Sequence, residues 1–106
     1  MSTISEYDWD NIFHDSTVSR DYAEVLYDWR NDDPEGEFCG IVKNTLTGSY
    51  YSFSAWHDYT GWDCRSGVEW FGPHDSVIGA AGQLTQESRR NLGFDHTPEH
   101  KDLYRD

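Results

Sequence analysis

The chain has little positive charge and no long apolar run, and both shortages exclude classes of partner. Its 106 residues contain eight Lys and Arg against 20 Asp and Glu, which gives a net charge of −12. That excess of negative charge repels nucleic-acid phosphates and anionic membrane surfaces. No apolar run approaches the roughly 20 residues of a membrane span. We therefore expect no direct binding to nucleic acid and no contact with a membrane.

Cysteine is scarce as well, and the usual catalytic motifs are missing. The two cysteines, Cys39 and Cys64, lack the spacing of a metal site or a disulfide framework. The N-terminal segment lacks the basic and apolar regions of a signal peptide. These observations predict a cytoplasmic chain with both thiols reduced. Because glycine-rich phosphate loops and nucleophile elbows are also missing, we expect no cofactor and no enzymatic activity.

Aromatic side chains are plentiful and can compensate for a low aliphatic content. They make up 16% of the residues, although only 36% of all residues are hydrophobic. Each aromatic side chain buries about 150–250 Å², so a few of them can build the core of a small domain. We expect one domain over residues 1–106, with residues 1–15 as an N-terminal arm and residues 95–106 as a polar tail.

Two segments have the apolar spacing of amphipathic helices. The first spans residues 20–31, with an apolar stripe made of Tyr22, Val25, Leu26 and Trp29. The second spans residues 77–92, with Asp75 or Ser76 as its N-cap and Gly93 directly after its end.

Between these helices, three segments alternate in the manner of β-strands. They span residues 38–43, 50–57 and 64–71, and a five-residue turn over 44–48 joins the first two into a hairpin. The order arm–α–β–β–β–α predicts an α+β fold in which two helices pack a three-stranded antiparallel sheet.

The acidic residues are concentrated near the N-terminus. Residues 1–38 carry a net charge of −9, which leaves −3 for residues 39–106. On the predicted first helix, Asp21, Glu24 and Asp28 would share one face. The row would reach about 16 Å if Asp32 extended it. Duplex DNA carries one charge per ~1.7 Å, so such a ridge could imitate its backbone, while the alternative is a merely solvated face.

Tyr7, Trp9, Trp56 and Trp62 are candidates for surface exposure, although core packing is the favoured interpretation for Trp56. Trp9 lies in the arm and Trp62 in the predicted loop before the third strand. Trp is enriched at the energetic centres of interfaces, although core packing is the alternative for each residue. The predicted partner-binding residues are Asp21, Glu24, Asp28, Asp32, Asp33, Glu35, Glu37, Trp9 and Trp62.

Two weaker patterns concern catalysis and metal binding. Cys64 follows His57 by seven residues, but a nucleophilic pair would also need a shared pocket and an oxyanion hole. A small buried cysteine in a loop is the favoured interpretation. His96 and His100 have helical i, i+4 spacing without a third ligand of definite spacing, which favours an exposed tail. We expect no catalytic residue and no metal ligand.

One stretch resembles known sequences. Asp58-Tyr59-Thr60-Gly61-Trp62-Asp63-Cys64, followed by Val68-Glu69-Trp70, resembles a pattern in small uncharacterised acidic proteins of bacteriophages, especially those of actinobacteria. The resemblance covers about a third of the chain (residues 58–92) and brings no activity or site residues with it. By analogy of class, it implies an anti-defence protein that acts in the host-cell cytoplasm.

These observations support one leading function and two alternatives. The leading hypothesis is a non-enzymatic, DNA-mimic-like inhibitor of the anti-CRISPR or anti-restriction type. Its partner would be a host defence protein with a basic, nucleic-acid-binding groove. The first alternative is an interaction or structural module with an aromatic surface, for example a homodimer. The second is a small enzyme with a site at His57 and Cys64.

Overall fold

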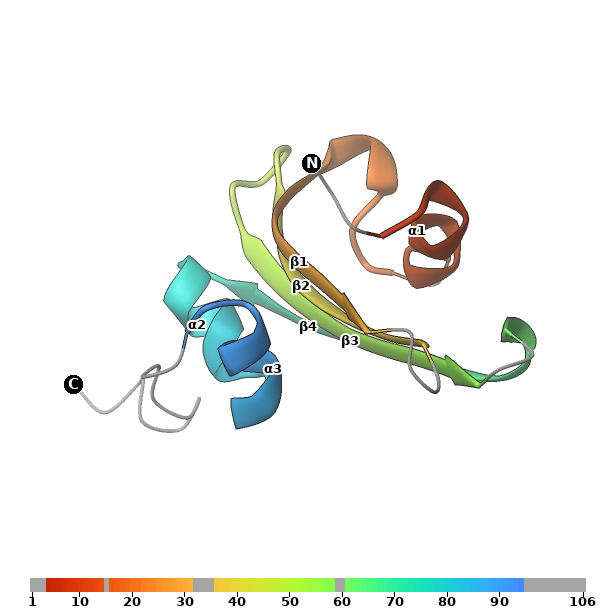
Figure 1. The fold of residues 1–106 in the computed structure, drawn as a ribbon. Helices are drawn as coiled ribbons and strands as arrows, with labels where there is room; N and C mark the ends of the chain where they lie inside the picture. Colours follow the sequence, from red (N-terminus) through yellow and green to blue (C-terminus); the bar gives the residue numbers. More distant parts are fainter. Residues whose placement is uncertain (1–3, 15, 32–35, 59–60, 95–106) are drawn as a thin grey trace.

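The computed structural model describes residues 4–14, 16–31, 36–58 and 61–94, with only the backbone at residues 61 and 63–65. Eight elements follow one another along these residues (Figure 1). They are α1 (Glu6–Ile12), the short 3₁₀-helix η1 (Arg20–Tyr22), β1 (Ala23–Asn31), β2 (Gly36–Asn44), β3 (Tyr50–Asp58), β4 (Gly61–His74), α2 (Val77–Gly82) and α3 (Gln86–Asn91).

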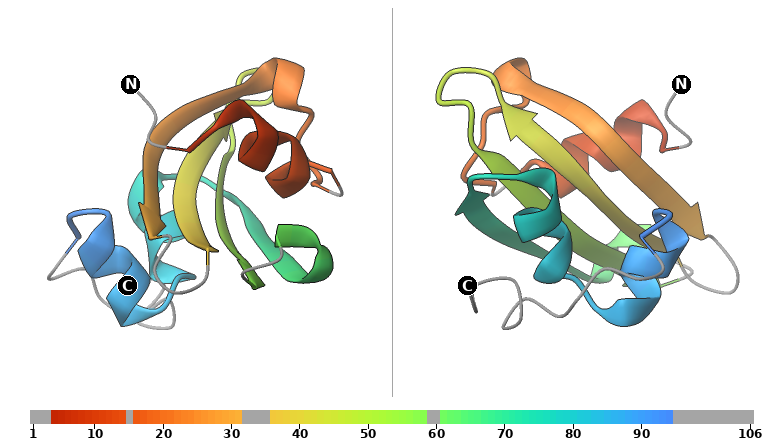
Figure 2. Two further views of the ribbon diagram at one scale, coloured as in Figure 1. Left: turned by 45° about the vertical axis from the view of Figure 1, so that its right-hand side comes forward. Right: turned by 90° about the vertical axis from the view of Figure 1, so that its left-hand side faces the viewer.

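The strands form one antiparallel sheet in the order β1-β2-β3-β4, so each strand pairs with its neighbour in sequence. Figure 2 shows the sheet curving between two layers, with α1 on one face and α2 and α3 on the other. The expected three-stranded sheet in α–β–β–β–α order is therefore wrong. The fourth strand is β1, which occupies the segment predicted as the first helix.

A β-bulge explains why residues 20–31 imitate a helix in sequence. Val25 pairs with Val42 and Tyr27 with Ile41, so that Leu26 is an extra residue in β1. Because the bulge interrupts the two-residue alternation, the apolar residues acquire a helical spacing within a strand. Valine and aromatic residues favour strands, and pairing with β2 satisfies the backbone groups on that edge of β1.

The first core lies between the sheet and the N-terminal segment. Trp9 and Ile12 of α1 are buried against Phe38, Val42 and Phe53 of the sheet. The segment expected as an arm therefore contributes Trp9 and Ile12 to the core.

Hydrogen bonds from two tryptophans of β4 hold α1 in place. The indole Nε1 of Trp62 donates to Asp8 Oδ1 at 2.8 Å, and Nε1 of Trp70 donates to the Ile12 carbonyl at 3.0 Å. Asp8 also accepts a bond from Ser5, the N-cap residue, whose hydroxyl accepts from the Asp8 amide. The Ser5 hydroxyl thus caps the first turn of the helix and also binds the Asp8 carboxylate. Asp8 thus joins the helix start to the sheet.

The second core lies on the opposite face, where Ala80 and Ala81 of α2 bury Ile41. The single helix predicted over residues 77–92 is wrong, because α2 ends at Gly82 and α3 begins after Thr85. The Thr85 hydroxyl accepts a hydrogen bond from the Ser88 amide at 3.1 Å. A side chain that binds the backbone in this way competes with a continuing helix and starts a new one.

Several local expectations are confirmed. Ser76 caps α2 through a 3.0 Å bond from the Gly79 amide to its hydroxyl. The hairpin turn over residues 44–48 contains Gly48 at φ +79°, and Gly93 follows α3 at φ +96°. Within the part of the chain that the structure describes, the helices are too short and too polar to cross a bilayer.

Aromatic rings of β3 cover glycines on both neighbouring strands. Phe53 lies opposite Gly40 of β2, and Trp56 lies opposite Gly67 of β4. A Cβ atom at either glycine would come within 2.6 Å of a ring atom. The missing side chains therefore allow these rings to lie close against the adjacent backbone.

Candidate functional site

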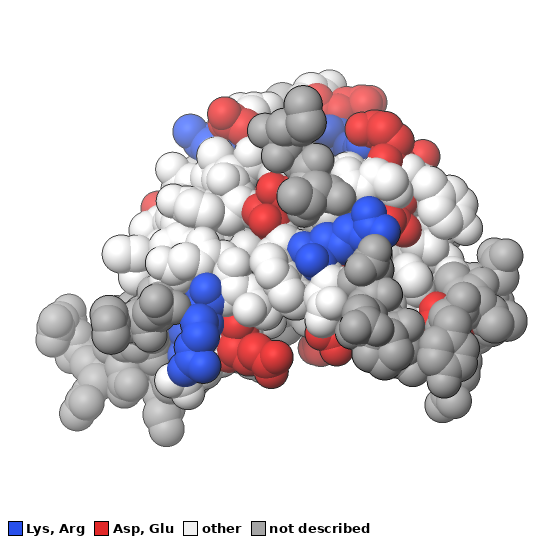
Figure 3. Space-filling model, viewed as in Figure 1, with Lys and Arg blue, Asp and Glu red and all other residues white. Residues whose placement is uncertain are grey.

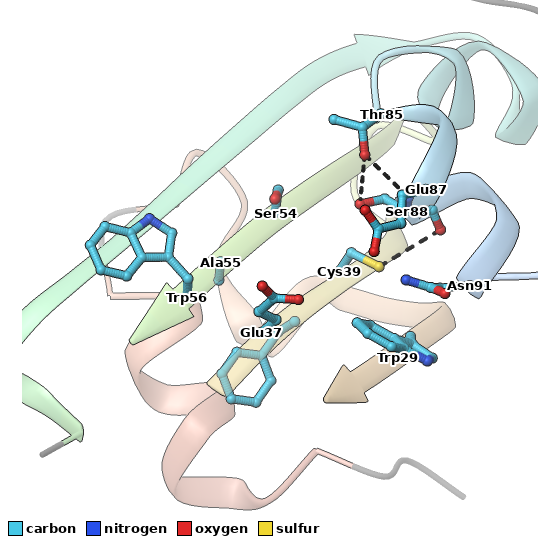
Figure 4. Close-up of a pocket in the computed structure, with 11 residues that line it drawn as sticks. Trp29, Glu37, Cys39, Ser54, Ala55, Trp56, Thr85, Glu87, Ser88 and Asn91 are labelled. Carbon is cyan, nitrogen blue, oxygen red and sulfur yellow. Dashed lines mark hydrogen bonds between the residues drawn. The ribbon is translucent and has the colours of Figure 1, made fainter. Parts of the chain in front are cut away.

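A groove of about 300 Å³ lies between the sheet and α3, on the face away from α1 (Figure 4). Its aromatic sides come from Trp29 of β1 and Trp56 of β3, and we call it the Trp29–Trp56 groove. Glu37 and Cys39 of β2 lie between these strands, and α3 contributes Glu87. The site therefore combines three strands and one helix.

The strand register explains how these side chains reach one face. Trp29 pairs with Cys39 and Cys39 with Ser54, while Glu37 pairs with Trp56 in the next row on the same face. Residues two apart on a strand point the same way. Since β1 and β3 are separated by two strand spacings, the backbones carrying the two indoles lie roughly 10 Å apart.

Trp56 presents an open aromatic surface at one side of the groove. The residue is 44% exposed, although β3 is an inner strand of the sheet. A Cβ atom at Gly67 would lie 2.6 Å from Trp56 Nε1, so part of the indole rests on the bare Cα of this glycine. A Trp ring with a solvent-accessible face attracts cations through its quadrupole.

The groove is negatively charged. Glu37 on the sheet and Glu87 on α3 are both exposed, and the described lining contains no Lys or Arg. Burial raises the pKa of the Cys39 thiol to about 12, and the negative charges of Glu37 and Asp28 add to this increase. The carboxylates therefore impose a negative potential at the groove floor. The thiol remains protonated at neutral pH and is a poor nucleophile.

The pKa of Cys39 predicts a pH-dependent stability. Because this pKa is raised from 9.0 to about 12 by folding, the stabilising contribution is complete below pH 9 and is lost as the pH rises toward 12. Between these values the loss is at most about 1.4 kcal/mol per pH unit. Urea unfolding at pH 8–11 should show a steeper decline for the wild type than for Cys39→Ala. Parallel declines would contradict the assignment.

The predicted acidic ridge does not have the expected geometry. Asp21 lies in η1, and Glu24 and Asp28 lie on β1 with opposite orientations, since they pair with Lys43 and Gly40 across the bulge. No helix aligns these acids. Figure 3 shows acidic residues as separate patches on the face in view.

The other predicted acids have different outcomes. Glu37 lines the groove. Asp32, Asp33 and Glu35 lie outside the described residues.

The two tryptophans predicted to bind a partner both pack against the core. Trp9 is only 3% exposed, so the expectation of surface exposure is wrong for it. Trp62 is half-buried, and its ring stacks on Phe38 with 5.6 Å between centroids. The groove uses Trp29, which the sequence predicts in a helical stripe, and Trp56, which is one of the candidates for surface exposure. A sequence signal for Trp56 existed, because it alternates with the small polar residues Ser52 and Ser54 on one face of β3.

A second cavity of about 300 Å³ lies between α1 and β4 and is lined by Trp62 and Trp70. The indole N–H groups of both residues already bond to α1. Its described lining contains no carboxylate, which distinguishes it from the Trp29–Trp56 groove.

The remaining chemical candidates find little support in the described geometry. The His57 ring packs against Phe38 and Trp62, and its Nδ1 lies 2.7 Å from the Asp58 carbonyl oxygen. The Cys64 side chain, His96 and His100 lie outside the described residues, so the pairing of His57 with Cys64 stays a prediction. The described part of the chain contains no group of three or more His, Cys, Asp or Glu that could hold a metal ion. Comparison of the chain with protein-family models, curated proteins and solved structures gives no match.

Proposed function

We propose that this chain is a non-enzymatic binding protein that engages a basic surface of a nucleic-acid-binding protein through the Trp29–Trp56 groove. The observation that carries the proposal is the combination of an exposed indole with two carboxylates in a groove whose described lining contains no base. The charge of −12 favours the same class of partner. A basic side chain would meet both an aromatic surface and an anionic one.

The two features act over different distances. The net negative charge accelerates the approach of a basic protein and makes association sensitive to salt. Inside the groove, a cation over an exposed Trp ring contributes about 0.5–1 kcal/mol, and more where water is excluded. The overall charge therefore sets the rate of encounter, and the groove selects the side chain that docks.

The resemblance to phage proteins suggests where such a partner would be found. A host defence protein of the CRISPR or restriction type must present basic residues to nucleic acid. Occupying those residues in the host cytoplasm would inhibit the protein. The helical ridge of acids no longer supports this proposal, which depends instead on the groove and the net charge. The alternative of an interaction module with an aromatic surface is weakened, because Trp9, one of its candidate contact residues, is buried.

A matched pair of double variants tests the proposal. The probe is a fluorescein-labelled 12-residue peptide of alternating basic residues and glycine, with anisotropy measured at low and high salt. Glu37→Gln with Glu87→Gln should weaken binding at least about tenfold, since both carboxylates of the groove are lost. Asp21→Asn with Glu24→Gln changes the net charge equally, but these exposed acids lie outside the groove. This control should weaken binding less than about threefold.

Two outcomes would contradict the proposal. Equal losses in the two double variants would show that overall charge alone attracts the peptide. No measurable binding at low salt would exclude a basic partner altogether. The same variants can then serve as baits in host lysate, where nucleic-acid-binding proteins should be captured by the control and not by the groove variant.

A further inference from the structure

We propose that the Trp29–Trp56 groove is an arginine site that discriminates against lysine. This inference rests on the proposed function and specifies which basic side chain the groove recognises. It follows from the number, placement and chemical type of the acceptors in the groove, together with the open face of Trp56.

The acceptors of the groove come from two sides. Glu37 extends from β2, between the two indoles, and Glu87 extends from α3 across the opening (Figure 4). Arg20 forms ion pairs with Glu6 and Asp10, and both of these acids lie outside the groove. Ser54 of β3 and Asn91 of α3 add a hydroxyl and an amide carbonyl to the lining. A ligand with donors directed to more than one side would satisfy this arrangement best.

A guanidinium group has that property. It is planar, carries five N–H donors in a rigid fork and can stack on an aromatic face while its edge donates to carboxylates. A lysine ammonium is a compact, strongly hydrated charge that loses more hydration on entering a partly enclosed site. The groove offers both an aromatic face at Trp56 and carboxylates at Glu37 and Glu87. Arginine can use both features at once.

The dimensions of the groove fit a single side chain. Its volume of about 300 Å³ lies at the lower end of the range for small-molecule sites, which is roughly 300–1,000 Å³. The Trp56 ring rests against Gly67, and the cap at Thr85 starts the helix that carries Glu87. The acceptors are thus held on ordered elements, which favours recognition of one shape.

Three peptides of equal length distinguish this inference from the proposed function. Each carries three residues of one type separated by glycine and serine, and the three types are arginine, lysine and the uncharged analogue citrulline. Two-dimensional NMR follows the indole N–H signals of Trp29 and Trp56 during titration. The arginine peptide should bind about tenfold more tightly than the lysine peptide, which has the same charge. Citrulline should not bind measurably.

Groove variants decide where the discrimination arises. In Trp56→Leu, which keeps apolar bulk without a π face, and in Glu87→Gln, the ratio between arginine and lysine affinities should fall toward one. Equal affinities of both cationic peptides, lost together in Glu37→Gln with Glu87→Gln, would overturn the arginine preference and leave the proposed function standing. If neither peptide shifts the indole signals, both are wrong. An unchanged ratio in the variants would place the discrimination outside this groove.

Discussion

Replacing Trp9 with alanine should lower the free energy of unfolding by about 3–5 kcal/mol, as expected for removing a buried aromatic ring from a core. The ring is 3% exposed and contacts the Phe13 and Phe53 rings at centroid distances of 5.7 and 5.5 Å. Removing it would leave a cavity between α1 and the sheet. Because a domain of this size has a total stability of roughly 5–15 kcal/mol, a large part of the population should unfold on mild heating. Urea denaturation followed by circular dichroism measures the loss.

Tyr7 on the same helix provides the matched control. It lies two residues from Trp9 and is 60% exposed. Since both substitutions replace an aromatic residue by alanine in α1, their effects on helix propensity are similar. Tyr7→Ala should change the stability by less than about 0.5 kcal/mol. If Trp9→Ala changed the free energy of unfolding only slightly but abolished partner binding, Trp9 would instead be part of the interaction surface.

Replacing Gly40 with alanine should have the second large effect, at the upper end of the roughly 1–3 kcal/mol typical of an overpacked core. The added Cβ atom would lie 2.5 Å from the Tyr27 carbonyl oxygen and 2.6 Å from Phe53 Cε2. The first atom belongs to the backbone of the neighbouring strand, and the second belongs to a fully buried ring. Neither can move without disturbing the centre of the sheet. Thermal and urea unfolding both report this loss.

Gly67→Ala adds the same methyl group as Gly40→Ala but in different surroundings, so the two variants show how far the neighbouring atoms determine the loss of stability. An alanine there would meet Trp56 Nε1 at 2.6 Å, but Trp56 is 44% exposed and can rotate away. Gly67→Ala should therefore cost less stability than Gly40→Ala and should shift the Trp56 indole signal in the NMR spectrum. Equal losses at the two positions would mean that strand geometry, rather than the neighbouring atoms, excludes a side chain.

The groove was only partly accessible to prediction from the sequence. Glu37 was identified as a partner-binding residue, because it belongs to the acidic N-terminal third, and it does line the groove. Glu87 was missed, since nothing near it in sequence predicts its position opposite β2. α2 ends at Gly82 and α3 begins after Thr85, whose hydroxyl accepts a bond from the Ser88 amide and so favours a new helix start over continuation.

The exposure of the tryptophans could not be derived from local patterns. Trp9 and Trp62 lie among acidic residues, which suggested a surface, yet Asp8 beside Trp9 accepts the Trp62 indole N–H and both rings contribute to one core. Trp56 is exposed because α3 leaves its end of the sheet open. Whether a ring is covered depends on which distant element packs above it, and sequence spacing does not contain that information.

The sequence by itself determined the features that depend on neighbouring residues. The turn over residues 44–48 requires a residue that tolerates positive φ, and Gly48 supplies it. Ser76 caps the helix that follows it, because its hydroxyl accepts a bond from the Gly79 amide three residues later. Only the tertiary structure decided that residues 23–31 form a strand and that α1 belongs to the core. Pairing with β2 and burial against the sheet outweigh local spacing, because these long-range contacts contribute more free energy than helix propensity. The groove arises from the same long-range packing.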